Sequence, residues 1–266
     1  MTNYLYKVLP PQYSHVNKVY CLLAATVFCA LPLCSTEAAA ENILKYSGTT
    51  NIHGDAKTWA AKDEYDGIDI RVTGVDPGYY TETTEALVLN NRSLNVKGKG
   101  KFVSIINTAQ NERIDNNGGI YAKGGSTVNF TDVDSIYIAA IAGKEGGNDS
   151  TVISAKDPFM GDRTGHTNTI NISGTVVQLI GSIDVFHSLG SLLNQNARHT
   201  VNAALSGSDS FWYGSTIGED GKRTTVNLSL SDGATWIFNA GKSFLNDGGK
   251  IHNLKLDKGV VLFADG

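Results

Sequence analysis

A four-residue pattern recurs five times along the chain and constrains its fold more than any other feature. Each copy has Ser or Thr, an apolar residue, Asn and a second apolar residue. The copies are Ser93–Val96, Thr127–Phe130, Thr169–Ile172, Thr200–Ala203 and Thr225–Leu228. This alternation has the two-residue period of a half-buried strand. The copies recur at intervals of 25 to 42 residues, and recurrence at such intervals is typical of stacked repeats. In a stacked repeat protein, we expect function in loops and surface patches rather than in a buried cleft.

A second strand is expected after each of the last four copies. These runs are Ser135–Ala139, Thr175–Ile180, Ser210–Tyr213 and Ala234–Phe238. The segments 206–209 and 231–233 before the last two are rich in Gly, Ser and Asp, which favour turns.

These elements predict an all-β chain folded as a parallel β-helix, a solenoid with short turns. A sandwich or antiparallel barrel is the alternative, but hairpin signals such as Asp-Gly are sparse. In the β-helix, we expect the apolar residues of the pattern to point inward: Val128, Phe130, Ile170, Ile172, Val201, Val226 and Leu228. Thr127, Asn129 and their equivalents would face outward or line a corner.

The spacing of the Asn residues bears on whether they can stack. Stacked Asn side chains about 4.8 Å apart form hydrogen-bonded ladders. The gaps between successive Asn positions are uneven, at 34, 42, 31 and 25 residues. We therefore expect no continuous ladder, and interpret the pattern as marking one corner of non-successive coils.

Three regions are expected along the chain: residues 1–40, 41–90 and 91–266. Residues 41–90 form an entry or cap region, with a strand at 68–72 and a buried run at 86–89. Residues 91–266 hold the repeats, interrupted by one inserted loop, 144–165, which lacks periodicity. The only short helical candidate in this part of the chain is 186–193.

The first forty residues have the features of a signal peptide. Val19–Leu31 is uncharged, and at this length it is short for a membrane-spanning helix. Small residues at Ala38 and Ala40 predict cleavage after Ala40, leaving Glu41 first. An uncleaved anchor, or lipidation at Cys34, is the alternative. All three cysteines precede the expected cleavage point, so the mature chain would contain no disulfide.

Charge and apolar content limit the partners. The net charge is −4 and no basic run occurs, so we expect no nucleic-acid partner. No later apolar stretch is long enough to span a membrane, so no stable membrane span is expected after cleavage.

The residues from Thr224 onward resemble bacterial autotransporter passenger domains of the pertactin-like, adhesin type. Thr225–Leu228, a turn and Gly233-Ala234-Thr235-Trp236 are similar to one passenger unit. Ile251–Asp257 and Gly259–Phe263 are similar to the next. The Gly-rich segments 118–121 and 124–128 are also passenger-like. The resemblance covers roughly residues 90–266 and the long signal region, and it is one of pattern rather than of an invariant motif.

This resemblance implies a type V secretion protein with a right-handed parallel β-helix and an adhesive role. Its partners would be the export machinery and a host-cell or matrix protein or glycan. Members of the family end in a translocator β-barrel, for which residues up to Gly266 leave no room. The expectation is an N-terminal passenger fragment, located at the cell surface or outer membrane, secreted, or periplasmic if the barrel is truly absent. A soluble periplasmic protein of other function is an alternative.

Catalytic patterns are weak, and we expect no catalytic residue, cofactor or metal. Gly207-Ser208-Asp209-Ser210 has the residue types of a serine-protease motif in the wrong order, and His53 would be its partner. A β-helix enzyme acting on polysaccharide or peptide stays an alternative, with Asp132 and Asp134 as paired carboxylates. Asp63, Glu64, Asp66 and Asp69 could hold calcium, but a solvated acidic turn is favoured.

The remaining candidates are single residues. The histidines after residue 40 are scattered and predict surface or strand-face positions; they are His53, His166, His187, His199 and His252. Phe211, Trp212 and Tyr213 are the candidate surface contact. Alternation places Trp212 on the face opposite Phe211 and Tyr213, so at least one large ring is expected to face outward unless a loop covers it.

Overall fold

In the computed structural model, the described residues are 42–48, 64–73, 75–76, 84–108, 110–111, 117–141, 150–156, 165–185, 197–218, 222–239 and 250–264. All of them lie within one compact unit that spans residues 40–266. The secondary structure of these residues consists of strands and turns, and the paired strands between successive coils run parallel. The chain is therefore all-β and folds as a parallel β-helix, as its repeats predict.

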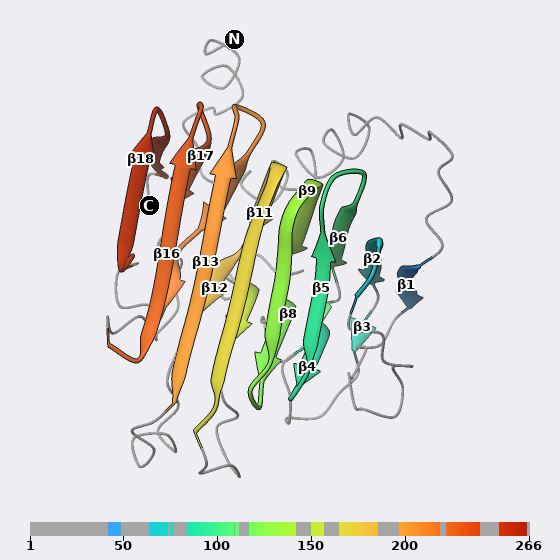
Figure 1. The fold of residues 1–266 in the computed structure, drawn as a ribbon. Helices are drawn as coiled ribbons and strands as arrows, with labels where there is room; N and C mark the ends of the chain where they lie inside the picture. The colour runs from blue at the N-terminus through green and yellow to red at the C-terminus, as the bar shows by residue number, and fades with distance from the viewer. Residues whose placement is uncertain are drawn as a thin grey trace. The chain divides into compact units, whose positions relative to one another are not determined.

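The described strands form three arrays, which the chain visits in the order first, second, third. The first array holds β5 (Ser93–Lys97), the N-terminal half of β9 (Thr127–Ala140), the N-terminal half of β11 (Thr167–Ile180), β13 (Arg198–Ser206), β16 (Thr224–Ser231) and β18 (Asn253–Asp257). Figure 1 shows these strands side by side. The five repeated patterns all lie in this array, and in successive coils.

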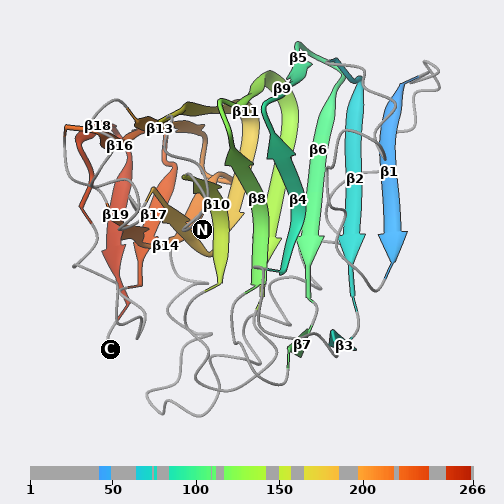
Figure 2. The same cartoon turned by 90° about the horizontal axis from the view of Figure 1, so that it is seen from below.

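The second array holds β1 (Ile43–Gly48), β2 (Gly67–Val72), β6 (Phe102–Asn107), the C-terminal halves of β9 and β11, β14 (Phe211–Gly214), β17 (Thr235–Phe238) and β19 (Val260–Phe263). The third array holds β4 (Thr84–Asn90), β8 (Asn117–Lys123), β10 (Thr151–Ala155), β12 (Ser182–Asp184) and β15 (Thr216–Ile217). A further short pair joins β3 (Val75–Asp76) to β7 (Gln110–Asn111). Figure 2 shows strands of the second and third arrays from below.

The core lies between the three arrays, and the alternation of the pattern accounts for it. In β9, Val128 and Phe130 are fully buried while Thr127 and Asn129 are half-buried on the outer side. The inward positions predicted in the other copies are buried as well. Burying an aliphatic or aromatic side chain contributes about 1.5–3 kcal/mol. The repeat therefore places one apolar row of each strand in a continuous core.

The structure contradicts the expected inserted loop in part and confirms two expected strands. The inserted loop expected over 144–165 is wrong in its middle, because Thr151–Ala155 forms β10 between β8 and β12 of the third array. Its buried Val152 and Ile153 lack alternation because both faces of that strand are covered. The strands expected at 68–72 and 86–89 are confirmed as β2 and β4, which pair with β6 and β8. The helical candidate 186–193 lies outside the described residues.

In the second array, two tryptophan side chains hydrogen-bond to glycine carbonyls of the preceding coil. Trp212 Nε1 donates to the Gly181 carbonyl (2.9 Å), and Trp236 Nε1 donates to the Gly214 carbonyl (3.0 Å). A Cβ on Gly214 would lie 2.1 Å from the Gly181 carbonyl oxygen, and its φ is +153°. Only glycine permits this approach, so the corner between second and third arrays depends on it.

Candidate functional site

The outer face of the first array is the most regular surface among the described residues. Its strands align without offset, so equivalent residues of the pattern stand directly beside one another. Thr127, Thr169, Thr200 and Thr225 form one row. The next row contains Asn95, Asn129, Asn171, Asn202, Asn227 and Asn253. We refer to this outer surface of the first array as the amide face.

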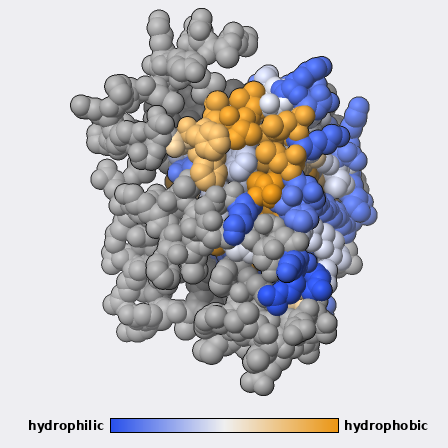
Figure 3. Space-filling view, turned by 90° about the vertical axis from the view of Figure 1, so that its left-hand side faces the viewer, coloured by the Kyte–Doolittle hydropathy of each residue, from blue (hydrophilic) through white to orange (hydrophobic). Residues whose placement is uncertain are grey.

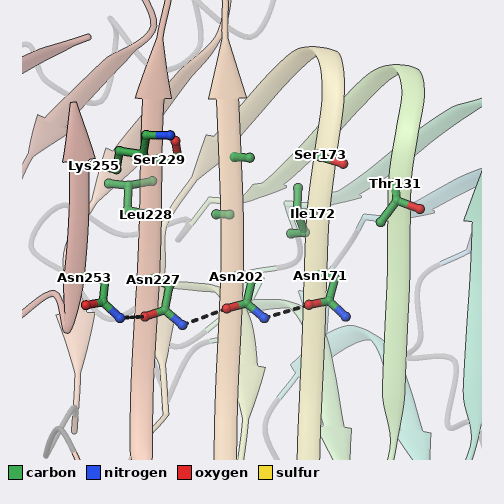
Figure 4. Close-up of a pocket in the computed structure, with 12 residues that line it drawn as sticks. Thr131, Asn171, Ile172, Ser173, Asn202, Asn227, Leu228, Ser229, Asn253 and Lys255 are labelled. Carbon is green, nitrogen blue, oxygen red and sulfur yellow. Dashed lines mark hydrogen bonds between the residues drawn. The ribbon is translucent and has the colours of Figure 1, made fainter. Parts of the chain in front are cut away.

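The asparagines of the amide face form one unbroken hydrogen-bonded ladder. Each Nδ2 donates to the Oδ1 of the preceding coil. The five donor–acceptor distances are 2.8 Å for Asn129 to Asn95, and 2.7 Å for Asn171 to Asn129, Asn202 to Asn171, Asn227 to Asn202 and Asn253 to Asn227. Part of it is drawn in Figure 4. The ladder has a single direction, with every amide dipole oriented alike.

The expectation that uneven spacing would prevent a continuous ladder is therefore wrong. The chain intervals between bonded asparagines range from 25 to 42 residues. The longest interval contains segments 141–150 and 156–166, which lie between strands of different arrays. Length variation is confined to these connections, while the first-array strands keep their register. Sequence spacing measures the whole coil, but stacking depends only on the aligned strand.

A shallow groove of about 330 Å³ runs along the amide face (Figure 4). Its lining residues are Thr131, Asn171, Ile172, Ser173, Asn202, Ala203, Ala204, Asn227, Leu228, Ser229, Asn253 and Lys255. Eleven of these twelve are uncharged, the exception being Lys255. In the outward row beyond the asparagines, Ser173, Ala204 and Ser229 have short side chains and stand in register, and Lys255 follows them at the last strand. The surface therefore stays open above the ladder.

The ladder leaves hydrogen-bonding capacity for a ligand. An Asn side chain has two N–H donors and a carbonyl oxygen with two lone pairs. A rung such as Asn202 uses one donor toward Asn171 and one lone pair toward Asn227. The ladder does not use the second donor or the second lone pair. The amide face can thus present neutral donors and acceptors at the spacing of parallel strands, about 4.8 Å.

Breaking the ladder in its middle should destabilise the stack. We expect Asn202→Leu to lower the free energy of unfolding by about 1–3 kcal/mol, because it deprives Asn171 of a donor and Asn227 of an acceptor. Asn253→Leu is the matched control, since it removes one ladder bond at an exposed rung. Urea denaturation followed by circular dichroism would measure both. If the two variants lose the same unfolding free energy, the ladder bonds in the middle of the stack do not contribute as proposed.

The three aromatic residues expected to make a surface contact do not all reach the surface. Trp212 of β14 is fully buried and stacks on Trp236, with ring centroids 5.1 Å apart and planes within 5°. The prediction of a surface contact is therefore wrong for Trp212, since its alternating position faces the core. Phe211 and Tyr213 are half-buried on the outer side. They belong to the second array and do not line the groove of the amide face.

The carboxylates proposed for glycan cleavage occupy a corner between the first and second arrays. Asp132 and Asp134 are exposed, with buried Val133 between them. Asp134 Oδ2 accepts a hydrogen bond from the Gly100 N–H (3.1 Å), and the Asp132 N–H donates to Ser173 Oγ (3.1 Å). Both bonds connect neighbouring coils, so the Asp134 carboxylate has a structural role at the corner, whereas Asp132 bonds there through its backbone.

The serine and acidic motifs are likewise engaged in local structure. Ser210 Oγ donates to the Ser206 carbonyl (2.6 Å) and accepts from the Val177 N–H (3.0 Å), as expected of a turn residue. In the acidic cluster, Lys101 Nζ lies 3.1 Å from Asp66 and 4.0 Å from Glu64. A basic side chain thus faces the described part of that cluster. His53 and Asp63 lie outside the described residues.

The histidine expectation holds only in part at one position. His199 lies on a face of β13, but it is fully buried, so a surface position is wrong there. Its Nδ1 lies 3.1 Å from Asn168 Nδ2, and Asn168 Oδ1 accepts from the Gly125 and Ser126 N–H groups (2.9 and 3.0 Å). This polar chain satisfies backbone groups where the third array leads into the first. His166 is half-buried, His252 is exposed, and His187 lies outside the described residues.

A buried ionic cluster was missed by the sequence patterns. Lys156, which follows β10, forms a salt bridge with Asp184 of β12, and buried Glu85 of β4 also acts on its charge. Burial alone would lower the pKa of Lys156, but the carboxylates outweigh it and raise that pKa. Lys156 Nζ also lies 5.9 Å from the centre of the Tyr121 ring. The only sequence signal is that Asp184 stands between two apolar residues, Ile183 and Val185.

The comparisons identify no relative. No family model, curated protein or solved structure matches the chain. Within the described ranges, no three His, Cys, Asp or Glu side chains are grouped so that they could hold a metal ion. The described residues also contain no helix long and apolar enough to cross a membrane. The expected cleavage residues Ala38, Ala40 and Glu41 lie outside them.

Proposed function

We propose that this protein is an exported, non-catalytic binding protein of the autotransporter passenger type, with an adhesin-like role at the bacterial surface. We further propose that its ligand is a neutral glycan bound along the amide face. Export and surface location rest on the signal-like segment and on the resemblance in residues 90–266. The parallel β-helix supports this proposal, because a solenoid offers an extended, rigid surface for binding.

One observation carries the choice of ligand class. The groove above the ladder combines unsatisfied amide capacity on Asn171, Asn202 and Asn227 with an almost complete lack of charge. A charged polymer would gain little electrostatic attraction there. A polyhydroxyl chain can both donate to and accept from each rung. The apolar lining residues Ile172 and Leu228 are buried, so a bound glycan would contact little of their side chains.

A groove-filling variant tests the proposal without disturbing the ladder. Ala204 is exposed at the centre of the groove, and it is in register with Ser173 and Ser229. We expect Ala204→Trp to reduce retention on an immobilised panel of neutral glycans by about tenfold or more, which corresponds to about 1.4 kcal/mol. Retention would be measured with the full chain.

Thr175→Trp is the matched control, because Thr175 is exposed at the corner between the two halves of β11 and does not line the groove. It should bind as the parent does. Failure of the parent to bind any member of the panel, or equal binding by the Ala204→Trp variant, would exclude the amide face as a glycan site. Circular dichroism of each variant establishes that the fold is retained.

A further inference from the structure

A buried polar row lies on the inner side of the first array, at the corner where the chain enters it from the third array. Asn168, His199 and Thr224 stand in register on β11, β13 and β16, and Ser126 lies beside Asn168 directly before β9. All four side chains are fully buried. We refer to them as the inner polar row. They line neither the ladder nor the groove of the amide face, so glycan binding does not account for them.

The orientation of the Asn168 amide fixes the protonation of His199. Asn168 Oδ1 accepts hydrogen bonds from two backbone N–H groups, those of Gly125 (2.9 Å) and Ser126 (3.0 Å). The other amide atom, Nδ2, therefore faces His199 Nδ1, at 3.1 Å. An amide nitrogen only donates, so Nδ1 has to accept. The hydrogen-bond network thus assigns His199 as a neutral ring with its hydrogen on Nε2.

Further hydrogen bonds extend the inner polar row to the coils on both sides. Ser126 Oγ accepts from the Arg92 N–H (3.2 Å) and donates to the Lys123 carbonyl (2.6 Å). In the other direction, the His199 N–H donates to the Arg223 carbonyl (2.8 Å). On β9, β11, β13 and β16, the next residue belongs to the threonine row of the amide face. The inner polar row therefore holds together the coils on which that face is built.

A proton on His199 Nδ1 fits neither orientation of the Asn168 amide. Protonated imidazole carries an N–H at both nitrogens, so the new Nδ1–H would face the Asn168 Nδ2–H. Turning the amide over would remove this clash, but Nδ2 would then face the N–H groups of Gly125 and Ser126. Either arrangement sets buried donors against each other, and a buried donor that loses its acceptor destabilises the fold.

The apolar interior around His199 also disfavours a positive charge. His199 shares the inner face of β13 with buried Val201 and Ala203. The same apolar layer continues through Leu228 of β16 to Leu254 of β18, and Figure 3 shows apolar side chains gathered on the β18 side of the molecule. Burial of a charge in such surroundings is costly unless a partner compensates it.

The charged residues of the neighbouring elements add to this effect. The described strands that pack against β13, namely β10, β11 and β16, contain no charged side chain. Asp184, on the adjoining β12, forms a salt bridge with Lys156. The other described residues that flank this corner and carry or can gain a positive charge are Arg92, Lys123, His166, Arg198, Lys222 and Arg223.

We propose that the inner polar row is a pH-sensitive switch that controls the alignment of the amide face. Protonation of His199 breaks its hydrogen bond with Asn168 and separates β11 from β13 where the amide face begins. An ordinary histidine protonates near pH 6.5. The stabilisation by the row is fully present above that pH, and it is lost as pH falls, because the unfolded chain then binds a proton that the folded row cannot hold. Acid thereby releases a glycan from the amide face; this last step rests on the proposed function.

The tautomer of His199 can be measured by nuclear magnetic resonance of the full chain labelled with ¹⁵N at histidine. At pH 7.5 we expect His199 to be neutral with its hydrogen on Nε2, and to stay neutral for as long as the chain is folded. A hydrogen on Nδ1, or protonation near pH 6.5 in the folded chain, would overturn the proposal. This measurement needs no variant at position 199, so it stays decisive if such a variant fails to fold.

Urea unfolding at pH 7.5 and pH 5.0 tests the switch itself. In the parent, we expect protonation of His199 to raise the unfolding equilibrium constant about 30-fold between these pH values. His199→Asn should lack this increase, because the new side-chain oxygen can accept from Asn168 but does not titrate. The matched control is His252→Asn, which replaces an exposed histidine and should behave as the parent does. The same pH dependence in His199→Asn as in the parent would contradict the switch.

Retention on an immobilised neutral glycan tests the link to the amide face. A neutral glycan has no titratable group, so a pH effect on retention comes from the protein. From pH 7.5 to pH 5.0, we expect retention to fall about tenfold or more for the parent and to stay constant for His199→Asn. Constant retention by the parent would overturn the control of the amide face by His199. If no glycan is retained at either pH, the proposed function fails, whereas the tautomer and unfolding measurements still decide the switch.

Discussion

Replacing Trp212 by alanine is expected to lower the free energy of unfolding by about 3–5 kcal/mol, the range found when large buried aromatic side chains are truncated. Trp212 is fully buried and stacks on Trp236 of the next coil. Its loss also removes the Nε1 donor of the Gly181 carbonyl. That carbonyl lies at the corner that only glycine at position 214 can approach closely. Urea denaturation followed by far-ultraviolet circular dichroism measures the change.

Phe211→Ala is the matched control for this prediction. Phe211 is adjacent in β14, pairs with the same two strands and is half-buried on the outer face. Its truncation should cost about 1 kcal/mol, as for a typical substitution. If both variants lose the same stability, the stacked tryptophan is not the main packing element of these coils.

Replacing Asp184 by asparagine is expected to cost about 3 kcal/mol at neutral pH, because removal of one partner leaves the Lys156 charge poorly compensated. The side chain of Asp184 is 8% exposed and that of Lys156 is 22% exposed. The residual solvent contact of Lys156 places the loss at the lower end of the range for buried pairs. Denaturant unfolding at neutral pH tests this. The control is Asp69→Asn. Asp69 is 35% exposed and its partner Arg71 is 40% exposed. Because this pair lies at the surface, we expect the variant to lose only about 0–1 kcal/mol of unfolding free energy.

The same pair predicts a dependence on alkaline pH. The folded protein raises the pKa of Lys156, so the proton is held more tightly in the folded than in the unfolded chain. The resulting stabilisation is fully present below the unfolded pKa of lysine, about 10.4, and it is lost as pH rises through the folded pKa. The stability difference between the parent and Asp184→Asn should therefore shrink above about pH 10. A constant difference across this range would show that the lysine charge is not the cause.

Local alternation was sufficient to predict β2, the strands that carry the five repeated patterns and the strands that follow the last four of them, but β1 and β6 of the second array were not predicted. Val128 and Phe130 were expected inside and Asn129 outside, and this is what the fold requires. β10 was missed because its two faces are both buried, which removes the alternation on which the prediction depends. The position of Trp212 was ambiguous for a related reason. Alternation separates two faces of a strand, but it does not say which one faces the core.

The sequence by itself determined that this chain consists of short strands with an apolar interior and favoured parallel stacking, because a two-residue period recurs along the chain with the same face assignment and few hairpin signals. Only the tertiary structure decided that Asn95 to Asn253 form one continuous ladder. Likewise, it brought Glu85, Lys156 and Asp184 together. These features depend on register between strands distant along the chain. That register is set by side-chain packing across coils, and the lengths of the connecting segments do not reveal it.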